Sequence, residues 1–127
     1  MRYTIYIALV LIAAFVVASP LNAADKPNVR VVGVDQYQIV EARTVYIYTL
    51  DTIVRKGALE KTYFFSVGPK GDILPLTILN LKKAFPDNHR FHDSLDMSFK
   101  YDSDLTKYDE FHNMFKVNRL LDATFER

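Results

Sequence analysis

The sequence has no cysteine and no tryptophan among its 127 residues, and it has only four glycines and five prolines. Without cysteine, the chain cannot form disulfides, thiol nucleophiles, iron–sulfur clusters, cysteine-based zinc sites or a cysteine-linked lipid anchor. Basic and acidic side chains nearly balance, 16 against 15, so no general electrostatic field attracts nucleic acid or an anionic bilayer. Half of the residues are hydrophobic, which excludes a disordered or collagen-like chain.

An uncharged apolar run, residues 5–18, lies close to the N-terminus. Arg2 precedes the run, and the breaker residues 19–20 and the small residues 22–24 follow it. A basic end, a short apolar core and small residues at a cleavage site are typical of a secretory signal peptide. The run is shorter than the roughly 20 apolar residues that span a bilayer, which argues against a permanent membrane helix.

We expect residues 1–23 to be a signal peptide that is cleaved after Ala23. Cleavage after Ala18 or Ala24 is the alternative, because Leu21 is unusual three residues before the expected cut. We expect the chain to contact a membrane only through this segment, if it is not cleaved.

Removal of the signal peptide leaves residues 24–127, which carry 15 basic and 15 acidic side chains. A neutral chain of about 100 residues can be stabilised by one hydrophobic core without disulfides. The sequence therefore predicts a single small domain in an exported bacterial envelope protein, either periplasmic or secreted.

The first half of this domain alternates between residue types, as in residues 45–48, where Val and Ile alternate with two Tyr. Such alternation is typical of half-buried strands. Turns with glycine and charged residues, at 55–57 and 68–72, separate the apolar runs. The predicted strands cover about 28–34, 43–54 and 59–67, with short additional ones at 36–41 and 72–75. We expect an antiparallel meander of three or four strands within about 28–75.

From Thr77 onward the spacing becomes helical, over about 77–124. Thr77 is placed to cap a first helix that Pro86 ends, and Asp87 is placed to cap a second. The predicted helices cover 78–85, 88–99 and 105–124, the last with Ser103 or Asp104 as its cap. The third depends on a stripe of four residues, Tyr108, Phe111, Phe115 and Asn118. The fold class is α+β, with three α-helices packed on one face of the antiparallel sheet.

Aromatic residues on the strands form the first candidate site. If helices cover one face of the sheet, the other face meets solvent or a partner. Side chains expected to line such a face are Tyr46, Tyr48, Tyr63 and Phe65. Amphipathic aromatic rings suit a protein, a peptide or a glycan. A sheet packed on both faces, with Tyr serving as a strand former, is the structural alternative.

A cluster of histidine and aspartate side chains forms the second candidate site. His89, His92 and Asp96 share one flank of the second predicted helix, and His112 is expected on the third. Imidazole and carboxylate in such an arrangement can bind a divalent metal. Arg90 follows the first histidine, so the general base of a His-Glu-x-x-His motif is absent. Histidines that pack at the border of the apolar stripe are the structural alternative.

No pattern of catalytic residues is present in the sequence. The serine spacings do not match a nucleophile elbow, and the glycine spacings do not match a phosphate loop. We therefore expect a non-catalytic binding or interaction module without a cofactor. The alternative is a metal-binding protein or metal-dependent enzyme that uses the His/Asp cluster.

Overall fold

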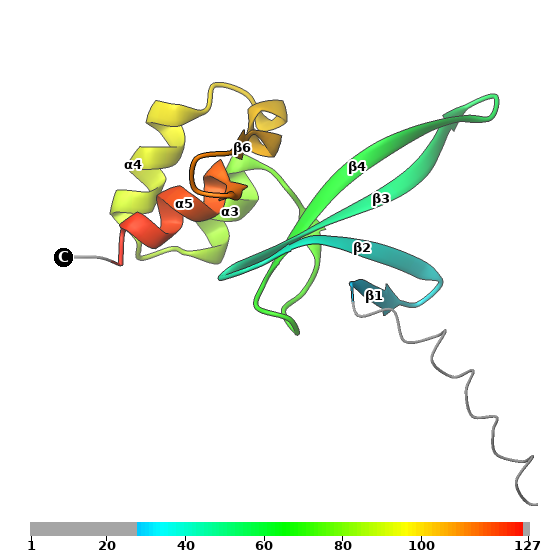
Figure 1. The fold of residues 1–127 in the computed structure, drawn as a ribbon, viewed down its shortest axis with the longest axis horizontal. Helices are drawn as coiled ribbons and strands as arrows, with labels where there is room; N and C mark the ends of the chain where they lie inside the picture. The colour runs from blue at the N-terminus through cyan, green and yellow to red at the C-terminus, as the bar shows by residue number, and fades with distance from the viewer. Residues whose placement is uncertain (1–27, 126–127) are drawn as a thin grey trace, which may run out of the picture.

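An antiparallel sheet of five strands comes first in the chain, and helices follow it (Figure 1). The computed structural model describes residues 28–125, so the predicted signal peptide and its cleavage site lie outside the described residues. The strands are β1 (Val29–Val32), β2 (Asp35–Ala42), β3 (Val45–Arg55), β4 (Ala58–Val67) and β5 (Leu74–Pro75). Their order in the sheet is their order in the chain. The expected α+β fold of one small domain is confirmed, and the sheet has five strands where a meander of three or four was expected.

Strands β3 and β4 form the longest hairpin, as their alternating sequences predict. Ile47 pairs with Phe65 in this hairpin. The turn is formed by Lys56 and Gly57, both with positive φ, at 25° and 79°. Two consecutive residues of positive φ match the twist of a two-residue hairpin, and glycine takes this conformation at no steric cost.

The second half of the chain is mainly helical but contains a small second sheet. Its elements are α3 (Ile78–Ala84), α4 (His89–Ser98), the 3₁₀ helix η1 (Asp102–Thr106), β6 (Tyr108–Asp109), β7 (Met114–Phe115) and α5 (Lys116–Ala123). The predicted cap of α3 is confirmed, because the Thr77 side chain accepts a hydrogen bond from Asn80 N at 3.0 Å. Helix α4 is capped by Asn88 rather than Asp87. None of the described helices is long and apolar enough to cross a membrane.

The predicted third helix over 105–124 is wrong in its first half. Strands β6 and β7 form a hairpin there, and only the second half, Lys116–Ala123, is helical. Phe111, expected on a buried stripe, is 90% exposed at the turn, and Asn113 has a φ of 55°. A left-handed residue interrupts a helix, and asparagine is one of the few residues that adopts this conformation readily.

The core lies between one face of the sheet and the helices. Val45, Ile47 and Phe65 contribute from the sheet. The remaining buried members are Leu76, Leu81, Phe91, Leu95, Phe99, Leu105, Phe115, Val117 and Leu121. The helices gather at one end of the sheet, and the outer part of the β3–β4 hairpin extends away from them (Figure 1). We call this projecting part, residues 52–61, the arm.

Candidate binding surface

The four aromatic residues predicted to line an open face do not share one environment. Tyr48 and Phe65 are fully buried, so their rings pack inside the molecule and do not reach a surface. Phe65 belongs to the core under the helices. Tyr46 and Tyr63 are only half-buried, which leaves these two of the predicted residues accessible.

Tyr48 lies on the opposite face from the helical core, beneath polar and aromatic neighbours. Its hydroxyl is 2.7 Å from Ser66 Oγ and accepts a hydrogen bond from Arg30 Nη1 at 3.0 Å. The Tyr37 ring stands edge-on against Tyr48 and Phe64, with centroids 6.0 and 5.3 Å away. Side chains of the sheet itself therefore pack around Tyr48 on the face opposite the helical core.

The helix flank predicted to bind a metal is occupied by hydrogen bonds and an ion pair. His92 Nε2 lies 2.8 Å from the Phe85 carbonyl oxygen and 3.2 Å from that of Lys82. The ammonium group of Lys82 forms an ion pair with Asp96 at 2.8 Å. These contacts join α4 to the end of α3, so His92 and Asp96 both hold the two helices together.

The other two predicted metal ligands lie apart from each other. The His89 ring packs against His92, with centroids 5.8 Å apart. His112 lies in the β6–β7 turn, where its Nδ1 is 2.8 Å from Asp109 Oδ2. Across residues 28–125, no three His, Asp or Glu side chains gather closely enough to hold a metal ion.

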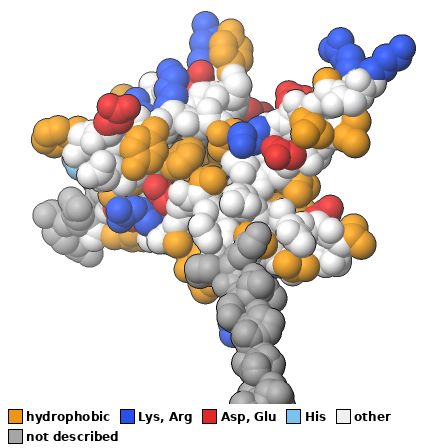
Figure 2. Space-filling view, turned by 45° about the vertical axis from the view of Figure 1, so that its right-hand side comes forward, with side chains coloured by type: hydrophobic (Ala, Val, Ile, Leu, Met, Phe, Trp, Pro, Cys, Tyr) orange, Lys and Arg blue, Asp and Glu red, His pale blue; other side chains and the backbone are white. Residues whose placement is uncertain are grey.

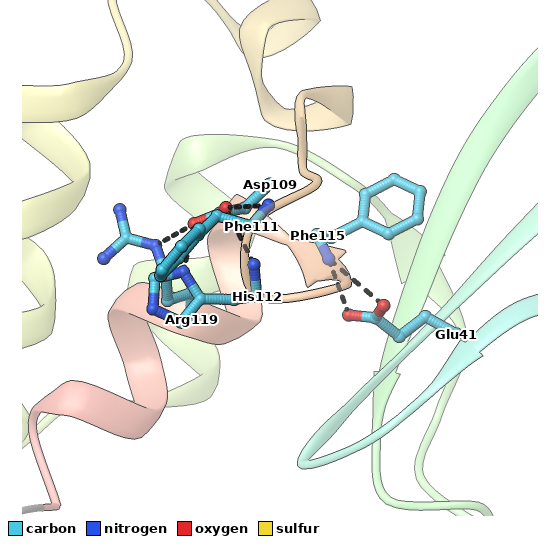
Figure 3. A network of polar contacts seen from close by, with 6 residues as sticks. All are labelled: Glu41, Asp109, Phe111, His112, Phe115 and Arg119. Atoms are coloured by element: carbon cyan, nitrogen blue, oxygen red, sulfur yellow. Dashed lines mark hydrogen bonds and ion pairs between the residues drawn. The ribbon is translucent and has the colours of Figure 1, made fainter.

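Asp109 organises the β6–β7 turn, and Figure 3 shows its contacts with Phe111, His112 and Arg119. Its Oδ1 accepts hydrogen bonds from the backbone N–H groups of Phe111 and His112, while Oδ2 contacts the His112 ring and Arg119. Partial burial raises the pKa of Asp109, but the hydrogen bonds and charges of His112 and Arg119 outweigh it, so the net pKa lies below its ordinary value. The turn is thus held by an ionised carboxylate.

Strand β4 has an open outer edge along the arm. Strand β5 pairs only with Phe64 and Phe65, and Leu76 N donates one further hydrogen bond to Tyr63 O at 3.1 Å. Backbone groups of a strand point alternately to its two sides, so those of Lys61 and Leu59 point outward like those of Tyr63. They have no backbone partner among the described residues.

A groove of about 450 Å³ begins where β5 ends, and we call it the edge groove. Its walls are the β4 edge, the segment after β5 and the 3₁₀ helix η1. The lining residues are Glu60, Lys61, Thr62, Tyr63, Pro75, Leu76, Thr77, Asp102, Ser103 and Thr106. Tyr63, one of the two accessible predicted aromatics, lies here. The open edge and this groove form one continuous surface, because Lys61 belongs to both.

The alternating residue pattern predicted strand β4 but not its open edge. Pro75 is a weak indication that β5 cannot continue pairing, because proline has no N–H to donate. Ser103 and Thr106 come beside β4 only through the fold, some 40 positions later in the chain than Lys61.

Comparisons with models of known protein families, with curated proteins and with solved structures found no match for this chain. Its function is therefore inferred from the geometry alone.

Proposed function

We propose that this chain is a non-catalytic binding module of the cell envelope that holds an extended polypeptide segment against the open edge of β4. The observation that carries the proposal is the short reach of β5. It covers β4 at Phe64 and Phe65, and no strand within residues 28–125 lies beside the outward backbone groups of Lys61 and Leu59.

An extended peptide fits this edge because its backbone offers the same repeat of donors and acceptors. Antiparallel addition to β4 would pair the peptide backbone with Lys61 and Leu59, as happens in other cases of strand addition. Alternate side chains of the peptide would then enter the edge groove, where the Tyr63 ring and the hydroxyls of Ser103 and Thr106 lie. A glycan has no regular row of backbone groups to match the edge.

Export belongs to the same proposal. The basic residue, apolar run and small residues before position 24 support a cleaved signal peptide. Protein recovered from its native host should begin at Ala24 when its N-terminus is sequenced. Recovery of the intact chain from the cytosol would contradict export, and it would leave the peptide site unaffected.

The peptide site is tested by photo-crosslinking in the native host. A photoreactive residue in place of Ser103, which is exposed in the edge groove, should form adducts with a polypeptide. The same residue in place of Met97, which is 85% exposed on α4, is the matched control site.

A second change identifies the β4 edge as the contact. Lys61→Pro removes an outward N–H and leaves the β3–β4 ladder intact, so it should abolish the adducts, whereas Lys61→Ala should retain them. Thermal unfolding establishes that both variants are folded. Strand addition would be refuted if adducts from position 103 still form in the Lys61→Pro variant. It would also be refuted if they are no more abundant than adducts from position 97.

A further inference from the structure

The tip of the arm, residues 53–59, exposes large hydrophobic side chains at the far end of the molecule. Ile53, Val54 and Leu59 are 72%, 49% and 65% exposed. A bulge after Ile53 places both Ile53 and Val54 opposite Leu59 on the neighbouring strand. None of the three belongs to the core. Such a cluster indicates an interaction site rather than a structural need.

The charge of the tip has one sign. Arg55 and Lys56 form the turn, and residues 53–59 contain no acidic side chain. Glu60, the next residue, is followed by Lys61, so these two charges offset one another. Figure 2 shows basic side chains at the very end of the arm, with hydrophobic side chains next to them. The chain is nearly neutral as a whole, yet the tip is cationic.

We propose that the arm tip docks on the surface of an anionic lipid bilayer. Ile53, Val54 and Leu59 would enter the headgroup region, and Arg55 and Lys56 would lie against lipid phosphates. Apolar side chains beside cations are the combination that binds such interfaces, through buried apolar area and attraction to anionic headgroups. This site adjoins the peptide site at Leu59, whose backbone groups belong to the open edge and whose side chain belongs to the tip.

The shape and charge of the tip favour a lipid surface over a second copy of the chain. The tip is the convex end of a hairpin and suits a broad, flat partner (Figure 1). Two tips placed together would bring four cations from Arg55 and Lys56 into proximity and supply no acid from within the tip. An anionic bilayer supplies the opposite charge.

The experiment places a fluorescent probe in the tip of the full chain. The chain has no tryptophan, so Val54→Trp introduces a single indole at a half-exposed position. With vesicles of phosphatidylcholine and phosphatidylglycerol, its emission should shift to shorter wavelength and be quenched by interfacially brominated lipid. Vesicles of phosphatidylcholine alone should cause a much smaller shift. Met97→Trp on α4 is the matched control and should remain unshifted in both.

Removal of the two cations tests the electrostatic part. Adding Arg55→Gln and Lys56→Gln to Val54→Trp should raise the lipid concentration for half-maximal shift by about fivefold for each cation. Two results would overturn the proposal. In the first, the emission of the indole at position 54 does not shift when anionic vesicles are added. In the second, it shifts equally with neutral vesicles. A shift without lipid, together with a doubled mass in solution, would assign the tip to a second copy instead.

Discussion

Asn118 joins the sheet to helix α5 through one side chain. Its Oδ1 accepts from Val45 N at 3.0 Å, and its Nδ2 donates to Val45 O at 2.9 Å and to Glu41 Oε2 at 2.8 Å. The side chain is fully buried and takes the place of a neighbouring strand residue. Glu41 also accepts from Phe115 N with both carboxylate oxygens, as Figure 3 shows, so the buried polar groups here have partners.

Asn118→Ala should lower the free energy of unfolding by about 3 kcal/mol, because it leaves the buried N–H and carbonyl of Val45 without their Asn118 partner and removes one of the donors to Glu41. Asn80→Ala is the matched control. The Asn80 side-chain amide donates one hydrogen bond, to the Pro75 carbonyl at an exposed site, and its loss should cost under about 1 kcal/mol. Chemical denaturation of the two variants measures the difference. Equal losses would mean that the Asn118 network contributes little to joining the layers.

Asp104 makes stability depend on pH through two backbone hydrogen bonds. The N–H groups of Tyr101 and Lys100 donate to its carboxylate and hold its pKa below the ordinary value near 3.8. A carboxyl group with a lowered folded pKa stabilises the protein fully above the unfolded value, and this contribution disappears as pH falls through the folded value.

Wild type should therefore be more stable than Asp104→Asn at neutral pH, and the difference should shrink below pH 3.8. Thermal unfolding across the acid range follows this difference. Asp93→Asn removes an exposed carboxylate that accepts no hydrogen bond among the described residues, and it controls for the loss of one charge. A difference in stability between wild type and Asp104→Asn that stays constant down to pH 2 would contradict a lowered pKa of Asp104 in the folded protein.

Individual residues were predictable from sequence where the physics is local. Thr77 caps a helix because its hydroxyl reaches an N–H only three residues away. The role of Asn118 was not predictable, because its partner Val45 lies 73 positions earlier. Likewise, the alternating pattern placed Tyr48 and Phe65 on strands but could not show that both side chains are fully buried.

At the scale of elements, the β6–β7 hairpin was mistaken for a helix because the spacing of its aromatic residues is ambiguous. Tyr108 and Phe115 are seven residues apart, which is two helical turns, yet here they are cross-strand partners. Asp109 decides the outcome locally, since its side chain takes the N–H groups of Phe111 and His112 that a helix would direct elsewhere. Asn113 then closes the turn.

Asp109→Ala should loosen this hairpin. The amides of Phe111 and His112 lose their acceptor, so hydrogen exchange at both should accelerate roughly three- to tenfold. Asp109→Asn keeps an acceptor oxygen and should cause a smaller change. Exchange followed by NMR resolves the two amides. Unchanged exchange in Asp109→Ala would show that the turn does not depend on this side chain.

Over the whole molecule, the sequence predicted the α+β class but not how the layers meet. Helices cover only the inner end of the sheet, so β3 has two environments along its length (Figure 1). Val45 and Ile47 are in the core, whereas Ile53 and Val54 are exposed. The same alternating pattern continues through both halves, and only the packing of distant helices distinguishes them. The open edge and the arm tip follow from this uneven cover.

This arrangement predicts that the arm tip is dispensable for folding. Thr52 pairs with Glu60, so Asn-Gly in place of residues 53–59 should close a shorter hairpin with a favourable two-residue turn. Because no residue from 53 to 59 belongs to the core, the free energy of unfolding should change by less than about 1 kcal/mol. Chemical denaturation measures this change. Adducts from position 103 should become less abundant but persist in the shortened chain, since the backbone groups of Leu59 are lost while Lys61 and the edge groove remain. A shortened chain that fails to fold would mean that the exposed side chains of the tip stabilise the domain.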